Sequence, residues 1–274
     1  MLVAELAAEW ELELETPFAR ARISLVVPGH GKDGGPAVLK INFPEPESEH
    51  EADALARWNG VGAARLLARD DERRALLLER CTPGKQLWEV DEPEANEIAA
   101  DVLSQLWRAP SGGPFKSLVE EAARWAANLP LAWEACGRPF EEALLDEAVA
   151  LLQSVELTSA DAVLLHQDLH GGNILSSERG WLAIDPKPLV GERAFDVASL
   201  LRDRRDELAR DEDAATRVMS RLDFFTARLG LDRERVRGWG IAHALAWAFE
   251  SGRVLPGHVE CAGVLAGTHD VWTS

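Results

Sequence analysis

The chain has 274 residues, a mass of 30.1 kDa and a formal net charge of −18, with 46% hydrophobic and 28% charged residues. This length is sufficient for two lobes around a large core, and the composition is typical of a globular enzyme. The acidic balance argues against a nucleic-acid partner, which needs a basic surface, and it favours a cationic small molecule unless the excess acid serves only solubility.

Three features of the sequence predict a cytoplasmic protein with no membrane contact. The N-terminus, Met-Leu-Val-Ala-Glu-Leu, has no basic region ahead of an apolar one, so we expect no secretory signal. No segment approaches the roughly 18 uninterrupted apolar residues of a membrane span. The cysteines Cys81, Cys136 and Cys261 are widely spaced and form neither a CxxC pair nor a disulfide-rich pattern.

The first 80 residues predict a small β-rich unit with one helix. The expected strands span residues 18–27, 37–43, 65–69 and 73–79. A cluster of turn-forming residues at 28–36 separates the first two strands. A helix is predicted over residues 46–58, because proline and acids occupy its first turn and apolar residues lie on one face.

After residue 84 the pattern changes to helical periodicity rich in alanine, leucine and glutamate. The expected helices span residues 92–107, 116–127, 138–155, 193–202, 212–229, 233–251 and 258–272. Apolar runs at 162–165 and 181–184 interrupt them and predict two buried strands. The expected architecture is therefore α+β, with a hinge near residues 79–84.

The most informative segment is His166-Gln-Asp168-Leu-His-Gly-Gly-Asn173, followed by Ile184-Asp185-Pro186. Phosphoryl transfer from ATP needs one carboxylate for the attacking hydroxyl, plus an amide oxygen and a second carboxylate that hold Mg²⁺. A surface turn is the alternative, since these residue types are common in turns. The apolar runs on both sides argue for a functional site at the ends of two strands.

These residues resemble the catalytic loop and metal segment of the aminoglycoside phosphotransferase family, a branch of the protein-kinase-like fold. The segment from Leu182 to Ala198 most resembles the streptomycin 6-phosphotransferase and hydroxyurea phosphotransferase group. The resemblance extends from about Val38 to the C-terminal helices. It implies a small β-rich N-lobe, residues 1–80, that binds ATP. It also implies a larger, mainly helical C-lobe, residues 81–274, that holds the catalytic loop, magnesium and the acceptor.

The resemblance assigns roles to five residues between His166 and Asp196. Asp168 would orient the acceptor hydroxyl and accept its proton, and Asn173 and Asp185 would bind Mg²⁺. His166 would hold the loop in place rather than take part in chemistry. Asp196 would support the backbone of the loop from below, although a plain helix cap is the alternative.

The resemblance also predicts the ATP site of the N-lobe. Lys40 would be the lysine that the kinase fold carries on its third strand and would face the α- and β-phosphates, the alternative being an edge-strand lysine in water. Glu51, on the following helix, is the expected partner of this lysine, and Glu47, one turn earlier, is the competitor. Backbone groups around Glu79 and Cys81 would bind adenine.

The sequence departs from the protein kinases in several places. Residues 28–32 are rich in glycine but lack the GxGxxGxV pattern, so a phosphate-covering loop and an ordinary hairpin are both open. Gln167 stands where protein kinases carry arginine, and Ile-Asp-Pro replaces Asp-Phe-Gly. No Ala-Pro-Glu follows, so the sequence predicts no switched activation loop.

The acceptor is expected to be a small cationic molecule that carries a hydroxyl, by resemblance a streptomycin-like aminoglycoside. Asp203, Asp206 and Glu250 are candidates to bind its charged groups, although residues 202–207 also resemble a solvated face. His170 could face the acceptor or bond within the loop. We expect an ATP- and Mg²⁺-dependent kinase, monomeric or weakly dimeric. The alternatives are a housekeeping kinase for a sugar, amino alcohol or hydroxyurea-like molecule, and an inactive nucleotide-binding scaffold.

Overall fold

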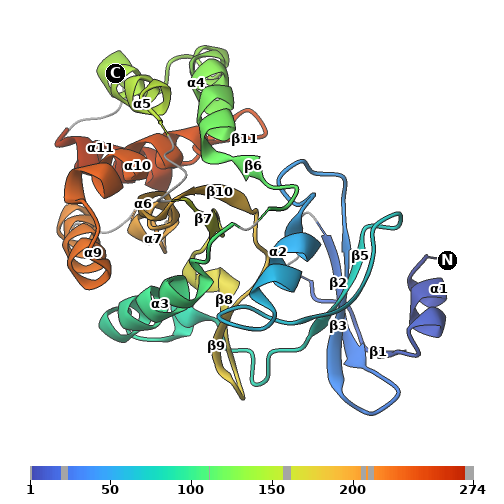
Figure 1. Cartoon of the computed structure of the whole chain (residues 1–274). Helices are drawn as coiled ribbons and strands as arrows, with labels where there is room; N and C mark the ends of the chain where they lie inside the picture. Colours follow the sequence, from blue (N-terminus) through green and yellow to red (C-terminus); the bar gives the residue numbers. More distant parts are fainter. Residues whose placement is uncertain are drawn as a thin grey trace.

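The computed structural model describes residues 2–19, 24–110, 112–156, 162–204, 208 and 213–268. A β-rich lobe formed by the first part of the chain lies beside a larger lobe made mostly of helices (Figure 1). This arrangement confirms the predicted α+β, two-lobed architecture. Within the described ranges, the structure contains no helix with the length and apolar character needed to cross a membrane.

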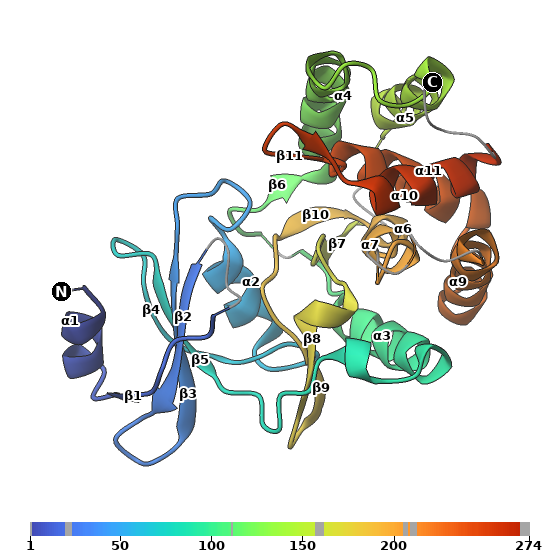
Figure 2. The ribbon, with the colours of Figure 1, turned by 180° about the vertical axis from the view of Figure 1, so that it is seen from behind.

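A five-stranded antiparallel sheet forms the smaller lobe, with its strands in the order β1-β2-β3-β5-β4. The strands are β1 (Glu13–Leu14), β2 (Ser24–His30), β3 (Pro36–Asn42), β4 (Leu66–Asp70) and β5 (Ala75–Glu79). Helices α1 (Leu2–Glu9) and α2 (Glu51–Trp58) lie on opposite faces of this sheet (Figure 2).

The alternation of side chains along β3 assigns its residues to these two faces. Leu39 and Ile41 pack with Leu6 of α1 in one buried cluster. Lys40 and Asn42 point the other way and bond to α2 through the carboxylate of Glu51. The strand therefore joins an apolar face to a polar one, and the polar face is turned toward the larger lobe.

Two expectations for the smaller lobe were wrong in detail. The lobe has a second helix, α1, which is eight residues long and has a single buried residue, Leu6. Such a short helix leaves little apolar periodicity in the sequence. Helix α2 begins at Glu51 rather than at Pro46, because residues 46–50 form turns, with Ser48 N donating to Glu45 O and Glu51 N to Ser48 O.

In the described residues, the larger lobe contains six longer helices and several short elements. The helices are α3 (Glu92–Leu106), α4 (Leu118–Ala135), α5 (Glu142–Gln153), α9 (Ala214–Leu229), α10 (Arg233–Ala246) and α11 (Pro256–Ala266). The short helices are η1 (Leu87–Glu89), η2 (Gly171–Asn173), α6 (Arg193–Asp196) and α7 (Ala198–Leu201).

Three small sheets complete this lobe. Residues 166–173 and 184–186, the central segment, lie between their strands. The first sheet has the order β6-β10-β7, and the others are the hairpins β8–β9 and β11–β12. Their strands are β6 (Lys116–Ser117), β7 (Ala162–Leu165), β8 (Ile174–Ser177), β9 (Gly180–Ala183), β10 (Leu189–Glu192), β11 (Phe249–Glu250) and β12 (Arg253–Val254). The two predicted apolar runs therefore correspond to β7 and, approximately, to β9.

The helices predicted over 193–202 and 233–251 are interrupted or end early in the structure. The helix predicted over 193–202 is divided at Val197 into α6 and α7. The helix predicted to reach residue 251 ends at Ala246, and the chain then forms the β11–β12 hairpin. Ser251 and Gly252 both have positive φ, 52° and 73°, which is the backbone of a tight hairpin turn and is incompatible with a continuing helix.

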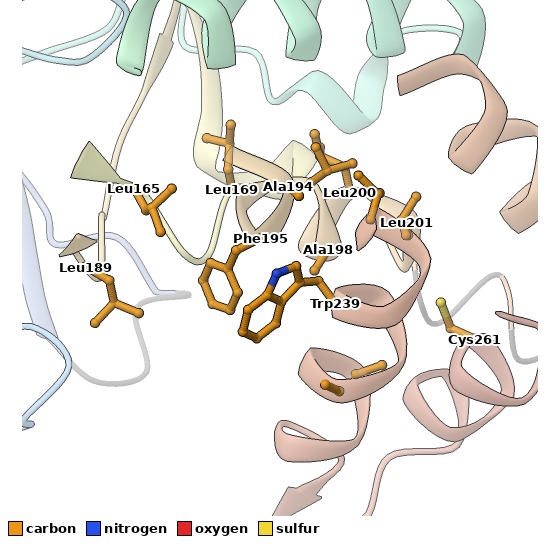
Figure 3. Close-up of a cluster of buried hydrophobic side chains, with 14 of the residues drawn as sticks. Leu165, Leu169, Leu189, Ala194, Phe195, Ala198, Leu200, Leu201, Trp239 and Cys261 are labelled. Carbon is orange, nitrogen blue, oxygen red and sulfur yellow. The ribbon is translucent and has the colours of Figure 1, made fainter. Parts of the chain in front are cut away.

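A packed apolar core lies directly beneath the central segment (Figure 3). Leu165 precedes this segment and Leu169 lies within it, and both are fully buried. Phe195 of α6 and Trp239 of α10 meet edge to face, with ring centroids 4.9 Å apart and an interplanar angle of 87°. This core gives residues 166–173 a rigid base from which their polar side chains project.

Candidate active site

Residues 166–173 form a loop between β7 and β8, called here the catalytic loop. Backbone hydrogen bonds within the loop join Asp168 N to His166 O, His170 N to Asp168 O and Asn173 N to His170 O, at 2.8–3.1 Å. Gln167 adopts a positive φ of 68°, a strained conformation for a residue other than glycine. The loop is therefore a defined, tightly wound structure.

Asp196 holds this loop from the core side, where the resemblance placed it. Its carboxylate is completely buried and accepts hydrogen bonds from the backbone N–H groups of His166 and Gln167, at 3.0 and 2.7 Å. Trp107 Nε1 donates to the other oxygen at 3.1 Å. Burial outweighs these hydrogen bonds and raises the pKa of Asp196 to about 6.

This raised pKa predicts a pH-dependent stability. Between the ordinary pKa of 3.8 and the folded-state value of about 6, the folded protein holds a proton that the unfolded chain has lost. The contribution of Asp196 to the free energy of unfolding should therefore fall by about 3 kcal/mol as the pH rises through this range. The difference in the free energy of unfolding between wild type and Asp196→Asn, measured in urea, should therefore change with pH over this range. A difference that does not depend on pH would contradict the assignment.

His166 lies under the loop, fully buried between the two lobes. Its Nε2 is 3.0 Å from the carbonyl oxygen of Ile184, and its ring stacks on Trp58 of α2 at 6.1 Å. Burial lowers the pKa of this imidazole to about 4. A neutral, enclosed ring of this kind joins the loop to the Ile184-Asp185-Pro186 segment, which agrees with a holding role.

Lys40 is the centre of a buried ion-pair network between the lobes. Its Nζ lies 2.7 Å from both carboxylate oxygens of Glu51 and 2.5 Å from Oδ1 of Asp185. The structure thus pairs Lys40 with Glu51, while Glu47 contacts Arg124. Burial alone would lower the pKa of Lys40, but the two carboxylates raise it to about 12, so the ammonium is charged.

Asn42, which was not predicted as a site residue, also bonds to Glu51, through Nδ2 at 2.7 Å. It stands two residues after Lys40 and therefore shares its face of β3. This spacing of two residues along a strand was the sequence signal that could have identified Asn42. The amide fixes the Glu51 carboxylate in the orientation that receives the lysine.

Asn173 and Asp185 are brought together by a backbone hydrogen bond from Ile184 N to Asn173 O, at 2.9 Å. The Nδ2 of Asn173 donates to Asp168 O at 2.9 Å, which directs its amide oxygen away from that carbonyl. The backbone of Asp185 has a positive φ of 57°. Burial would raise the pKa of this carboxyl, but the positive charges of Lys40 and Lys187 outweigh burial and hold the pKa well below the usual range.

The donor set of these two residues fits Mg²⁺, which takes oxygen ligands from one or two protein groups and the remainder from phosphate and water. Among the residues that the structure describes, no group of three or more His, Cys, Asp or Glu side chains is arranged to hold a metal ion. The described residues therefore contain no site at which three or more of these side chains alone would enclose a metal ion.

Asp168 is paired with a lysine that the sequence analysis did not identify. Lys187 Nζ lies 2.7 Å from Asp168 Oδ2, and the two side chains are only 12% and 10% exposed. Burial raises the pKa of Asp168, but the positive charge of Lys187 more than offsets this and keeps the pKa below its usual value. The carboxylate is thus ionised, as a proton acceptor must be.

His170 is held against the side of the loop by Trp88 of η1. The two rings stack at 5.1 Å with an interplanar angle of 8°, and Gly172 N donates to His170 Nδ1 at 3.0 Å. Trp88 Nε1 and Gly171 N both donate to Asp203 Oδ1, at 2.6 and 3.1 Å. Asp203, predicted as an acceptor-binding residue, therefore bonds to the catalytic loop and Trp88 in this structure.

The Gly171-Gly172 pair allows Trp88 to lie flat on the loop backbone. A Cβ at Gly172 would approach Cη2 of Trp88 to 2.6 Å, so Gly172→Ala should destabilise the fold by about 1–3 kcal/mol through overpacking. The double variant Gly172→Ala with Trp88→Leu should recover part of this loss in urea unfolding. Additive effects of the two substitutions would exclude the contact as the cause.

The predicted adenine-binding hinge lies at the end of β5, beside a cavity of about 580 Å³ that is lined by Glu79, Cys81 and Arg179 among others. The Glu79 carboxylate accepts two hydrogen bonds from Arg179, at 2.7 and 2.9 Å. Burial raises the pKa of the Cys81 thiol to about 11, so this group is a protonated packing residue at neutral pH. The glycine-rich turn nearby is closed by hydrogen bonds between Gly31 and Gly34 or Gly35.

A second cavity, of about 530 Å³, opens onto Asp168 from the side of the C-terminal helices. It is lined by residues of the catalytic loop, α4, α10, the β11–β12 hairpin and α11, with Lys187 and Glu47. Glu250, one of the predicted acceptor residues, and His170 are part of this lining. Asp206, another predicted acceptor residue, lies outside the described residues.

A two-lobed fold, a buried lysine–glutamate pair that contacts Asp185 of the larger lobe, and a carboxylate-bearing loop at a cavity together are the arrangement of a kinase. The sequence matches the family model described as aminoglycoside/hydroxyurea antibiotic resistance kinase over residues 9–254. The chain belongs to this family, and it is a phosphotransferase with an alcohol group as acceptor. Membership of a kinase family implies ATP as the phosphoryl donor.

Curated relatives agree with this assignment. The chain is 35% identical to streptomycin 6-kinase of Streptomyces glaucescens, an alignment that covers 97% of this chain and 89% of the relative. It is 39% identical to hydroxyurea phosphotransferase of Kitasatospora aureofaciens, over 97% of this chain and 78% of the relative.

Solved structures share the fold at low sequence identity. A thermostable mutant of an aminoglycoside phosphotransferase, in ternary complex with ADP and hygromycin B, has a TM-score of 0.66 at 14% identity and covers 97% of this chain and 98% of its own. Choline kinase LicA from Streptococcus pneumoniae has a TM-score of 0.63 at 13% identity, with the same two coverages. These likenesses confirm the protein-kinase-like fold.

Proposed function

We propose that this phosphotransferase transfers the γ-phosphoryl group of ATP to a hydroxyl group of a streptomycin-like aminoglycoside and so inactivates the antibiotic. The observation that carries the proposal is the cavity of about 530 Å³ at Asp168. Its lining combines the carboxylate of Glu250 with the aromatic rings of Trp125 and Trp247, and it also contains Glu47, which is paired with Arg124. Carboxylates and aromatic faces are the groups that attract guanidinium and ammonium substituents.

Hydroxyurea is a second candidate acceptor, because the chain is 39% identical to a hydroxyurea phosphotransferase. That molecule has only a handful of non-hydrogen atoms, whereas the cavity of about 530 Å³ has the volume typical of sites for drug-sized ligands. The size of the cavity therefore favours the larger acceptor.

The roles of the residues follow from their positions. Asp168, ionised and open to the cavity, would orient the acceptor hydroxyl and accept its proton. Lys40 would hold the phosphates of ATP, and Glu51 would keep the lysine in place. Asn173 and Asp185 would bind Mg²⁺, which supplies charge neutralisation at the phosphate oxygens when it is bound.

The lobe boundary at residues 80 and 81 is also part of the proposal. All five strands of the N-lobe sheet end before Arg80, and the catalytic loop and nearly all of the residues lining the acceptor cavity follow it. Lys40 and Asp168 belong to one chain, so the proposed site is complete in a single subunit, whether the enzyme is a monomer or a weak dimer.

The proposal is tested by incubating the purified protein with Mg-ATP and separate acceptors, and detecting phosphorylated products by mass spectrometry. The panel contains streptomycin, a second aminoglycoside, hydroxyurea, a sugar and an amino alcohol. Phosphorylation of streptomycin above the others would support the proposal. Turnover confined to hydroxyurea, the sugar or the amino alcohol would overturn the choice of acceptor while leaving the kinase chemistry intact.

A further inference from the structure

Lys187 lies in an unusually constrained position for a long, flexible side chain. Pro186 and Pro188 flank it and fix the backbone φ on either side. Its own N–H donates to the carbonyl oxygen of His166 at 3.0 Å, which ties it to the catalytic loop. The side chain is 12% exposed, with Nζ 5.6 Å from the centroid of the Trp247 ring. Holding an ammonium in so enclosed a place costs desolvation energy, so it needs a partner.

The ammonium lies at the point where the two halves of the reaction meet. It contacts Asp168, the proposed proton acceptor, at 2.7 Å, and lines the acceptor cavity. It also interacts electrostatically with Asp185, two residues earlier, which is a proposed ligand of the metal on the donor side. A phosphoryl group that moves from the donor to the acceptor must pass between these two carboxylates, and therefore beside Lys187.

Two other cations near this point, Lys40 and Arg124, already have carboxylate partners. Lys40 is bonded to both Glu51 and Asp185. Arg124, elsewhere in the cavity lining, is paired with Glu121 and Glu47. Lys187 has three N–H donors, and the hydrogen bond to Asp168 Oδ2 uses one of them. The geometry of an ammonium allows the others to reach a phosphate oxygen while the bond to Asp168 is kept.

We propose that Lys187 is a catalytic residue whose ammonium contacts the transferred phosphoryl group while it remains bonded to Asp168. In this step a bond forms between the acceptor oxygen and the γ-phosphorus. The bond from the γ-phosphorus to the bridging oxygen breaks, its electron pair leaves with ADP, and the hydroxyl proton passes to Asp168. Lys187 keeps its protons throughout and offsets negative charge on the phosphoryl oxygens. This inference rests on the proposed roles of Asp168 and Asp185.

The test compares Lys187→Met, Lys187→Arg and the control Lys32→Met, whose exposed lysine is paired with Glu11. Lys187→Met should lower kcat roughly 10²-fold to 10³-fold, with little change in the KM for ATP. Its affinity for ADP, measured by calorimetry, should stay within about twofold, whereas its affinity for ADP with aluminium fluoride should fall strongly, because only the latter mimics the transferred group. Lys187→Arg should restore part of both losses.

Equal affinity of wild type and Lys187→Met for ADP with aluminium fluoride would overturn the proposal. The proposal would also be overturned if Lys187→Met lost affinity equally for ADP and for ADP with aluminium fluoride and had a lowered melting temperature, because these results indicate a structural role. In that case Lys187→Arg distinguishes loss of the positive charge from loss of packing. The binding measurement needs no acceptor. It therefore tests Lys187 even if the acceptor panel gives no product, an outcome that would count against the proposed function alone.

Discussion

Replacing Asp168 with asparagine is expected to lower kcat for phosphoryl transfer by roughly 10²-fold to 10⁴-fold, the range for loss of a general base. Asparagine keeps the shape of the side chain but cannot accept the hydroxyl proton. The loop itself should persist, because its backbone hydrogen bonds and the buried Asp196 carboxylate do not involve the Asp168 side chain. Steady-state kinetics with Mg-ATP and the best acceptor would measure the effect.

The matching control is Asp146→Asn, an exposed acid on α5, which should retain full activity. Asp168→Asn leaves the Lys187 ammonium without its carboxylate partner, so the melting temperature and the affinity for ADP must be measured together with kcat. If a folded Asp168→Asn protein that binds ADP kept wild-type kcat, Asp168 would not be the base.

Replacing Lys40 with methionine is expected to damage both stability and activity. The substitution leaves the carboxylates of Glu51, 1% exposed, and Asp185 close together without their shared cation. Breaking a buried ion pair in this way typically destabilises a protein by about 3–5 kcal/mol. Urea unfolding would measure this loss, and kcat/KM for ATP should fall by roughly 10²-fold or more because the phosphates lose a fixed positive charge.

Two further variants separate these effects. Lys32→Met removes an exposed surface lysine and should change neither quantity. Lys40→Met combined with Glu51→Gln removes one of the unpaired charges and should recover stability but not ATP turnover. Recovery of both by the double variant would contradict a direct role of Lys40 at the phosphates.

The parts of the site that could be predicted are those in which the sequence itself fixes the spacing. Asp168 and Asn173 lie in one short loop, and Asp185 comes just after the next hairpin, so their chemistry was visible as a local pattern. The pairing of Lys40 with Glu51 was expected from the family resemblance. In the structure, Lys40 also contacts Asp185, which is 145 residues away in the chain.

The residues that escaped prediction depend on contacts that no local pattern records. Trp88 bonds to Asp203, which lies 115 positions further along the chain. Asp203 was expected to bind the acceptor, and no local pattern indicated that it would bond to Trp88. Lys187 is closer, 19 residues from Asp168, but a lysine between two prolines gave no sign of where its ammonium would point. The turn at Ser251 and Gly252 did carry a recognisable signal, which the long apolar helical pattern before it obscured.

The most direct test of the central claim is the fate of the γ-phosphate when ATP labelled at that position is mixed with streptomycin and the wild-type protein. The proposed mechanism predicts that the label appears covalently on the antibiotic, and that Asp168→Asn slows this transfer by roughly 10²-fold or more while still binding ADP. Label found only in inorganic phosphate, or equal transfer by both proteins, would contradict it.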